Sequence, residues 1–198
     1  MIKPQLVLDI AGVIVTNLSP SYWEEIAQIA DISYNKIKEL FKQEVRDALW
    51  TGRTSEQQFW EWLTLHCPTI ETQYARQLMD KHLKVLPAIK HLEHWSQVAD
   101  IHLLSNHRHE WLVDLLKPVE PYIQTITISS EVGFCKPDIS IYNLVNSRIK
   151  SELIIYVDDQ EKNLDTARHL GGIAMIADQE GKWTDGITNI LEKHKELK

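Results

Sequence analysis

The first stretch of the chain is an apolar run that carries a single carboxylate. Residues 6–15 read LVLDIAGVIV, with Asp9 and Gly12 set among aliphatic side chains. A continuous apolar run of this kind is typical of a strand buried on both faces of a parallel sheet. Ligands bind such sheets outside the carboxyl ends of the strands, so we expect Asp9 at a ligand-binding edge. Gly12 permits a sharp turn there that brings backbone close to a ligand.

Residues 19–86 change to the spacing of amphipathic helices. Apolar side chains recur three and four positions apart, and Pro, Gly and capping residues separate four such segments. The expected helices begin near Ser19, Ser33, Thr54 and Glu71. Four consecutive helices with short connections are typical of an antiparallel bundle.

From Pro87 onward, strands and helices alternate. The expected strands cover residues 101–104, 125–129, 153–157 and 173–177, and the expected helices cover residues 88–98, 110–116, 139–149, 162–170 and 185–197. This alternation predicts an α/β fold with a Rossmann-like, doubly wound parallel sheet. The helical block then interrupts the sheet after its first strand. We expect a core domain of residues 1–15 and 87–198, with a four-helix cap over residues 16–86 inserted into it.

The composition is that of a globular protein with an acidic balance. Hydrophobic side chains make up 43% of the 198 residues and charged ones 25%, which argues against disorder. The net charge of −7 argues against nonspecific nucleic-acid binding, which depends on Lys and Arg. No apolar run approaches the roughly 18 residues that a membrane helix needs. Cys67 and Cys135 fit no metal or redox spacing and, without a secretory signal, favour a reducing, cytoplasmic location. The oligomeric state stays open.

Polar side chains gather where the expected strands end. They are Asp9, Ser105, Asn106, Lys136, Asp158 and Asp159. Because the carboxyl ends of parallel strands meet at one edge, these side chains are expected to lie together. Three carboxylates without a cation would repel one another, and oxygen ligands combined with a phosphate suit Mg²⁺. Ser105 can donate to a phosphoryl oxygen, Lys136 can stabilise its charge, and Asp9 can act as a nucleophile.

Four short segments resemble the motifs of one enzyme superfamily. They are DIAGV at residues 9–13, LSN at 104–106, KPD at 136–138 and VDD at 157–159. In this order they resemble the haloacid dehalogenase-like (HAD) hydrolases that carry an α-helical cap after the first strand. The resemblance spans nearly the whole chain. The cap segment LWTGRTSEQQFWEWL also resembles a subgroup of small bacterial sugar-phosphate phosphatases.

The resemblance implies Mg²⁺-dependent hydrolysis of small, sugar phosphate-like monoesters through an aspartyl-phosphate. Asp9 would be both the nucleophile and a metal ligand. The carbonyl of Ala11 and the carboxylate of Asp159 would be further ligands, and Asp158 would bind the ion directly or through water. Asn163 would brace the loop that holds the metal.

The same resemblance assigns the phosphoryl group to two side chains. Ser105 and Lys136 would hold it during transfer. Asn106 would position the substrate or a loop, and Gly12 is expected to approach the substrate through its backbone. Arg53 follows a glycine at the expected tip of the bundle, which makes it a candidate substrate contact.

The chain departs from the superfamily pattern at Ala11. Phosphatases of this superfamily usually have a second Asp there, and general acid–base help of that kind is typically worth 10²–10⁴-fold. His107 is a candidate replacement. The pattern also resembles phosphonoacetaldehyde hydrolases, which use a cap lysine as a Schiff base; Lys36, Lys38 and Lys42 are candidates, although a solvated helix face explains each of them. The residues are also compatible with a haloacid dehalogenase and with a catalytically weak ligand- or protein-binding module, and the sequence does not identify the phosphate ester.

Overall fold

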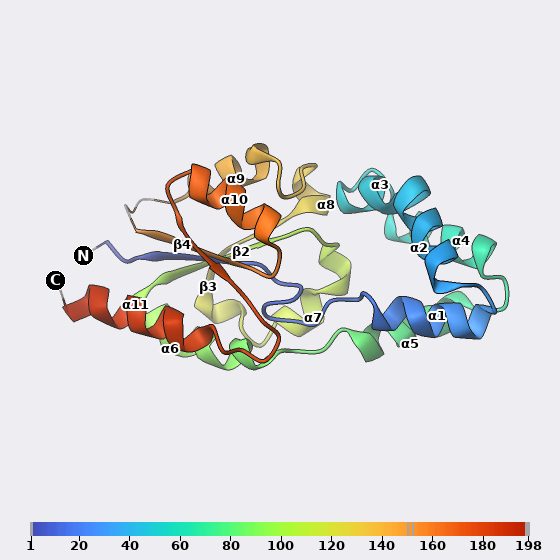
Figure 1. The fold of residues 1–198 in the computed structure, drawn as a ribbon, viewed down its shortest axis with the longest axis horizontal. Coiled ribbons are helices and arrows are strands. Elements are labelled where there is room, and N and C mark those ends of the chain that lie inside the picture. The colour runs from blue at the N-terminus through green and yellow to red at the C-terminus, as the bar shows by residue number, and fades with distance from the viewer. Residues whose placement is uncertain (1, 150, 152, 197–198) are drawn as a thin grey trace.

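A five-stranded parallel sheet forms the centre of the larger part of the molecule (Figure 1). The computed structural model describes residues 2–149, 151 and 153–196. The strand order is β3-β2-β1-β4-β5, and every neighbouring pair is parallel. The strands are β1 (Gln5–Leu8), β2 (Asp100–Ser105), β3 (Ile123–Ile128), β4 (Ile154–Asp158) and β5 (Ile173–Ile176). This topology confirms the expected α/β fold, with the first strand at the centre.

Helices cover both faces of the sheet (Figure 1). One face packs against α9 (Ile139–Asn146) and α10 (Glu161–His169), and its core includes Val7. The other face, which includes Leu6 and Leu8, packs against α6 (Leu92–Val98), α7 (Val113–Leu116) and α11 (Thr184–Glu196). Since successive side chains of a strand point to opposite faces, the all-apolar β1 is buried on both sides. Short helical segments cover Pro87–His91, His109–Trp111, Glu120–Tyr122 and Ser129–Val132, the last of which is α8.

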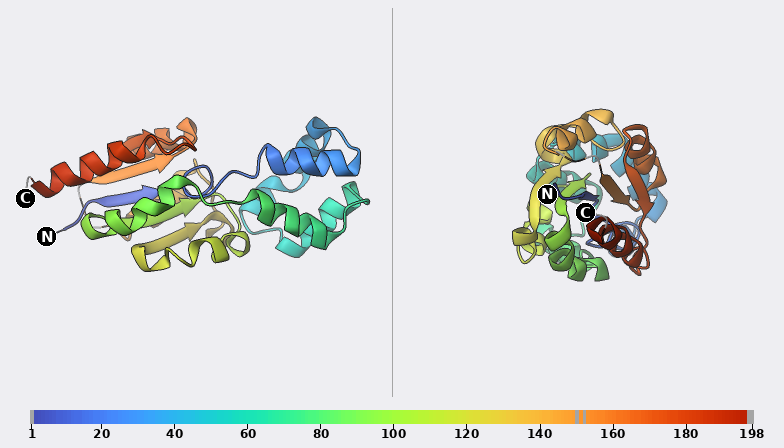
Figure 2. Two further views of the ribbon diagram at one scale, coloured as in Figure 1. Left: turned by 90° about the horizontal axis from the view of Figure 1, so that it is seen from below. Right: turned by 90° about the vertical axis from the view of Figure 1, so that its left-hand side faces the viewer.

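The remaining helices lie beyond the carboxyl ends of the strands and form a separate lobe (Figures 1 and 2). They are α1 (Ser21–Ala30), α2 (Tyr34–Leu40), a π-helical turn (Phe41–Val45), α3 (Arg46–Trp50), α4 (Glu56–His66) and α5 (Thr72–His82). We call α1–α5 the helical block. Its centre is aromatic, with Trp23, Phe59 and Trp60 buried. The second of the four expected helices is continuous but contains the π-helical turn. Residues 16–86 remain our proposed extent of the cap.

Several segments differ from the expected secondary structure; the helix expected over 88–98, for instance, is a 3-10 helix at Pro87–His91 followed by α6. The first strand ends at Leu8, and the apolar residues after it form a tight turn in which the amides of Ile14 and Val15 donate to the carbonyl of Ile10, at 2.8 and 2.9 Å. Val13, Ile14 and Val15 are apolar because the turn is buried, and not because it is extended. The expected helix over 110–116 is a 3-10 turn followed by the four-residue α7.

Two expectations from composition can be compared with the structure directly. None of the described helices is long and apolar enough to cross a membrane. Cys67 is buried, Cys135 is partly buried, and both thiols are free.

Candidate active site

The three central strands bring two carboxylates and a hydroxyl to one edge of the sheet. Asp9 directly follows β1, Ser105 ends β2, and Asp158 ends β4. The hydroxyl of Ser105 donates to Oδ1 of Asp9 at 2.7 Å. Lys136, from the loop before α9, places its ammonium 2.9 Å from Oδ2 of Asp9 and 2.5 Å from Oδ2 of Asp158. The structure therefore brings together four of the polar side chains that the sequence singled out.

These ionisable groups are buried, and their charges depend on one another. Burial raises the pKa of Asp9 from 3.8 to about 7; the ammonium of Lys136 opposes this rise, and the carboxylate of Asp158 adds to it. Burial also opposes the charge of Lys136, but the two carboxylates outweigh burial and raise the pKa of that ammonium. Lys136 is thus held as a buried cation between two acids.

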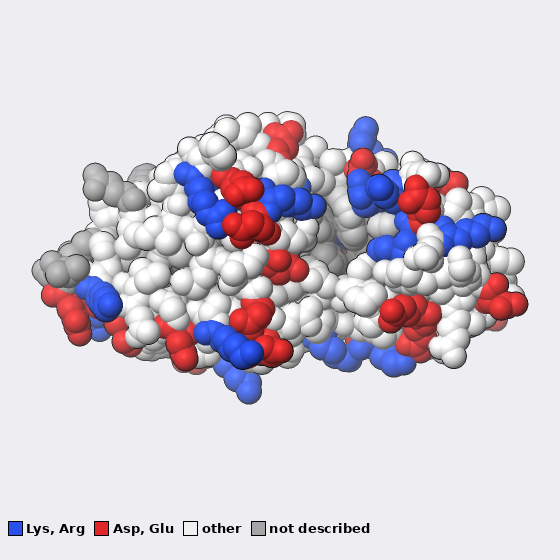
Figure 3. Space-filling model, viewed as in Figure 1, with Lys and Arg blue, Asp and Glu red and all other residues white. Residues whose placement is uncertain are grey.

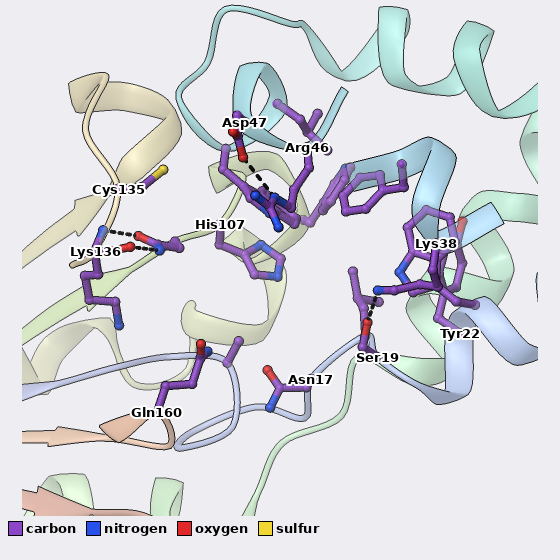
Figure 4. Close-up of a pocket in the computed structure, with 18 of the residues that line it drawn as sticks. Asn17, Ser19, Tyr22, Lys38, Arg46, Asp47, His107, Cys135, Lys136 and Gln160 are labelled. Atoms are coloured by element: carbon purple, nitrogen blue, oxygen red, sulfur yellow. Dashed lines mark hydrogen bonds and ion pairs between the residues drawn. The ribbon is translucent and has the colours of Figure 1, made fainter. Parts of the chain in front are cut away.

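Two asparagines hold the charged groups in position. Asn106 donates from Nδ2 to the carbonyl of Lys136 at 2.8 Å and accepts from its amide at 2.7 Å, so it clamps the lysine backbone (Figure 4). Asn163, from α10, donates to both carboxylate oxygens of Asp158 at 2.9 and 3.1 Å. These contacts tie Asn106 to the Lys136 loop and Asn163 to Asp158, while the expected roles of Asn106 toward the substrate or a loop and of Asn163 toward the metal stay predictions.

Three carboxylates could hold a divalent cation. Oxygen atoms of Asp9, Asp158 and Asp159 lie within 4.8 Å of one another. Of the three, Asp9 and Asp158 share one ammonium, while Asp159 accepts from Nδ2 of Asn17 at 2.8 Å. Three acids against one lysine leave an excess of negative charge, and their hard oxygen atoms are the donors that Mg²⁺ prefers. The residues present therefore fit a Mg²⁺ ion.

Gly12 sits against this acidic cluster. Its φ is +85°, and a Cβ there would lie 2.3 Å from Oδ2 of Asp159 and 2.7 Å from Nδ2 of Asn17. Its amide donates to the carbonyl of Val15 at 2.7 Å within the turn. The absence of a side chain at Gly12 therefore leaves the space that Asp159 occupies. The expected backbone contact of Gly12 with substrate stays a prediction.

A cleft of about 590 Å³ lies between the sheet edge and the helical block. Figure 3 shows the surface hollowed between the two parts of the molecule. Side chains from both parts line the cleft: Ala11, Asn106, Lys136 and Asp159 from the sheet edge, and Trp23, Lys38, Phe41, Arg46 and Trp50 from the helical block. This volume is typical of pockets for small ligands.

The other sequence candidates have different surroundings. His107 lines the cleft, its ring lies 5.5 Å from that of Trp50, and burial lowers its pKa to about 4, which keeps it neutral. Arg53 is exposed and donates to the hydroxyl of Thr51 at 3.0 Å. It is not among the described residues that line the cleft. Its contact with substrate therefore stays a prediction.

Two basic residues of the helical block line the cleft, and the sequence offers one of them, Lys38, only as a candidate Schiff-base lysine, while it does not single out Arg46. Lys38 was interpreted as part of a solvated helix face, but it lines the cleft, whereas Lys36 and Lys42 are exposed and do not. Arg46 also lines it, eight positions later. No motif marks either residue, and their common orientation depends on the π-helical turn between them.

Comparison with known proteins gives similarity of structure alone. No protein-family model and no curated protein sequence matches the chain. A predicted HAD-like family hydrolase from Porphyromonas gingivalis matches with a TM-score of 0.77 and 21% identity, over 96% of this chain and 98% of that one. A HAD family enzyme from Bacteroides thetaiotaomicron matches with a TM-score of 0.81 and 17% identity, over 94% and 99%.

A third similar structure is that of a dehalogenase. It is the L-2-haloacid dehalogenase from Xanthobacter autotrophicus with chloropropionic acid covalently bound, with a TM-score of 0.61 and 17% identity over 89% of this chain and 78% of that one. All three structures share the fold of this chain. The chain therefore has the fold of the HAD-like hydrolases, as its motifs indicate.

Proposed function

We propose that the protein hydrolyses small phosphate monoesters, of the sugar-phosphate kind, with Mg²⁺ and through an aspartyl-phosphate on Asp9. The observation that carries this proposal is the buried Asp9 carboxylate, held by Ser105 at 2.7 Å and by Lys136 at 2.9 Å. These contacts place a hydroxyl donor and a cation beside the Asp9 carboxylate, at the edge of a cleft that suits a small ligand, and so support its role as the nucleophile.

The reaction needs two displacements at phosphorus. An oxygen of Asp9 attacks phosphorus, the bond to the ester oxygen breaks, and the leaving group departs as an alcohol after taking up a proton. Water then attacks phosphorus, the bond to Asp9 breaks, and inorganic phosphate leaves. In both steps Lys136 and Ser105 stabilise charge on the phosphoryl oxygens.

The metal site supports this assignment. The carboxylates of Asp9, Asp158 and Asp159, with the carbonyl of Ala11, are the groups that would hold Mg²⁺. When bound, the ion supplies positive charge that offsets the phosphate and the acids around it. A second structure of the similar Bacteroides thetaiotaomicron enzyme, which aligns with this chain at 20% identity, is a complex with magnesium and inorganic phosphate.

Ala11 sets the expected rate. Its methyl group lines the cleft and cannot donate or accept a proton. Because general acid–base help is typically worth 10²–10⁴-fold, we expect slow turnover. The effect should be smallest for esters with good leaving groups, since these need no proton as they depart.

The first test is hydrolysis of p-nitrophenyl phosphate and a panel of sugar phosphates, with Mg²⁺ and with EDTA. Asp9→Asn is the decisive variant, and Asp114→Asn is its control, since Asp114 is exposed and does not line the cleft. We expect turnover that EDTA and Asp9→Asn each abolish and that Asp114→Asn leaves unchanged. Full metal-dependent activity in Asp9→Asn would refute the nucleophile, and a folded protein without turnover would refute the phosphatase.

Cleavage of a carbon–phosphorus bond is a second candidate, favoured by one observation. Lys38 lines the same cleft as Ala11, and burial, with Arg46 nearby, lowers its pKa. Such an amine can condense with an aldehyde, losing water and forming an imine that borohydride reduces. Inactivation by borohydride that requires both phosphonoacetaldehyde and Lys38 would support this candidate. Metal-independent release of chloride from 2-chloropropionate would instead indicate a dehalogenase.

A further inference from the structure

Two cations of the helical block face the cleft opposite the phosphoryl-binding residues. Lys38 and Arg46 both line the cavity, and Figure 4 shows Lys38 across it from Lys136. The reaction proposed above uses neither of them. Lys136 and Ser105 at the sheet edge already serve the transferred phosphoryl group, so this second basic region needs a different ligand.

Among the described residues, Lys38 has no acidic partner. Its ammonium lies 2.6 Å from the hydroxyl of Ser19, and among the ion pairs of the described residues none involves this lysine. The same ammonium lies 5.3 Å from the ring centre of Trp23 and 5.7 Å from that of Phe41. Aromatic faces attract a cation, so these contacts favour the charged lysine.

Arg46 adds a second charge beside the first. Its Nε pairs with Asp47, the next residue, at 2.9 Å, in a contact where Arg46 is partly exposed and Asp47 largely exposed. After burial, repulsion from Arg46 is the second cause that lowers the pKa of Lys38. Two cations against one exposed carboxylate leave an excess of positive charge on this wall of the cleft. An anion between them would relieve their repulsion.

The π-helical turn is what gives Lys38 and Arg46 a common face. In a regular α-helix two residues eight positions apart differ by about 80° around the axis. The amide of Arg46 donates to the carbonyl of Phe41, five residues back, and the π-helical turn covers Phe41–Val45. One extra residue in the turn moves Arg46 to the direction of a seventh position, about 20° from Lys38. Such π-helical turns occur frequently at functional sites.

We propose that Lys38 and Arg46 bind a second anionic group of the substrate. The preferred ester is then one whose leaving group carries a carboxylate or another phosphate, with the transferred phosphoryl group on Lys136 and Ser105. This inference rests on the proposed phosphatase function. The cleft of about 590 Å³ accommodates a small molecule with an anionic group at each end.

The test compares matched substrates that differ in the second charge. 3-Phosphoglycerate against glycerol 3-phosphate tests a carboxylate, and glucose 1,6-bisphosphate against glucose 1-phosphate tests a phosphate. The variants are Lys38→Met and Arg46→Gln, with Lys36→Met as the control, because Lys36 is exposed on the same helix and does not line the cleft. We measure kcat/KM for each member of each pair.

We expect the wild-type protein to prefer the doubly anionic member of at least one pair by tenfold or more. Each of Lys38→Met and Arg46→Gln should lower this ratio on the order of tenfold, as for loss of a hydrogen bond to a charged group, while Lys36→Met keeps it. The pair that responds identifies a carboxylate or a phosphate. Equal kcat/KM for both members of both pairs would overturn the inference, and so would equal losses on both members in the variants.

Binding to Asp9→Asn separates this inference from the proposed function. Calorimetric titration of that variant with the same four compounds needs no turnover. Tighter binding of a doubly anionic compound, lost with Lys38→Met in the Asp9→Asn background, supports the second anion site even if no ester is hydrolysed. Turnover without any such difference in affinity would leave the phosphatase intact and refute the second anion site.

Discussion

Replacing Gly12 by Ala tests how the acidic cluster is seated. The new Cβ would lie 2.3 Å from Oδ2 of Asp159 and 2.7 Å from Nδ2 of Asn17, which is closer than non-bonded atoms approach. The backbone of Gly12, at a φ of +85°, stands in the left-handed region. Ala must therefore adopt an unfavourable conformation, and Asp159 must also move away from the turn.

The expected cost has two parts. A left-handed conformation costs an alanine roughly 1–2 kcal/mol. Displacing Asp159 also breaks its 2.8 Å hydrogen bond with Asn17, and a bond to a charged group is worth about 1.5 kcal/mol at the low end, which suits these partly exposed partners. We expect Gly12→Ala to lower the free energy of unfolding by about 3 kcal/mol. Loss of support for a metal ligand should weaken Mg²⁺ binding about 10–100-fold.

Gly171→Ala is the matched control. Gly171 has a φ of +84°, and a Cβ there meets no atom within 4 Å, so this variant carries the conformational cost without the contact. Urea unfolding in EDTA gives the stability of each variant, and calorimetric titration with Mg²⁺ gives its affinity. We expect Gly171→Ala to lose roughly 1–2 kcal/mol and to bind Mg²⁺ like the wild type. Equal Mg²⁺ affinity in Gly12→Ala would refute the role of this contact.

Three further changes probe the buried charges and the junction with the helical block. Lys136→Met leaves two acids unpaired and should cost about 3–5 kcal/mol in urea unfolding at pH 7 with EDTA; an unchanged midpoint would contradict the pairing. His107 has an ordinary pKa of 6.5 when unfolded and about 4 when folded, so the unfolded chain gains protons first as pH falls. At pH 5 the wild type should therefore lose about 2 kcal/mol that His107→Gln keeps, and parallel pH profiles from 7.5 to 5 would contradict this. Gly52, after α3 of the helical block, lies against Ser130 of α8, and Gly52→Ala puts a Cβ 2.0 Å from the carbonyl oxygen of Ser130. Because this clash shifts the helical block relative to the sheet, we expect a raised KM with little change in Mg²⁺ affinity. An unchanged KM would contradict a role of this contact in shaping the cleft.

The sheet and the residues at its carboxyl edge could be predicted because both follow local rules. The strand expected over 101–104 is observed at Asp100–Ser105, and the one over 153–157 at Ile154–Asp158. Parallel strands bring their ends to one edge, so placing Asp9, Ser105 and Asp158 required only the position of each strand. Lys136 could be added to them because it lies in the loop that follows the strand expected over 125–129.

The cleft wall contributed by the helical block could not be predicted in the same way. Its composition depends on the angle at which each helix presents its side chains, and one extra residue in a turn changes that angle by about 100°. The sequence carries no mark at Phe41–Val45 that distinguishes a π-helical turn from an α-helix. From the sequence, a solvated helix face therefore explains Lys38, and nothing singles out Arg46, although both line the cleft.

Under the proposed function, the residues for the chemical step and the residues for substrate selectivity belong to different parts of the molecule. Asp9, our proposed nucleophile, lies with Ser105 and Asp158 at the ends of the central strands, while Lys38 and Arg46 lie on a block that joins the sheet through the segments between β1 and α1 and between α5 and α6. Arg108, which donates to the carbonyl of Thr54 at 2.6 Å, is a further contact between the two parts. Substitutions in the block should therefore change which ester is preferred, whereas substitutions at the strand ends should abolish turnover of every ester. The same sheet edge can then serve different substrates as the block that faces it changes.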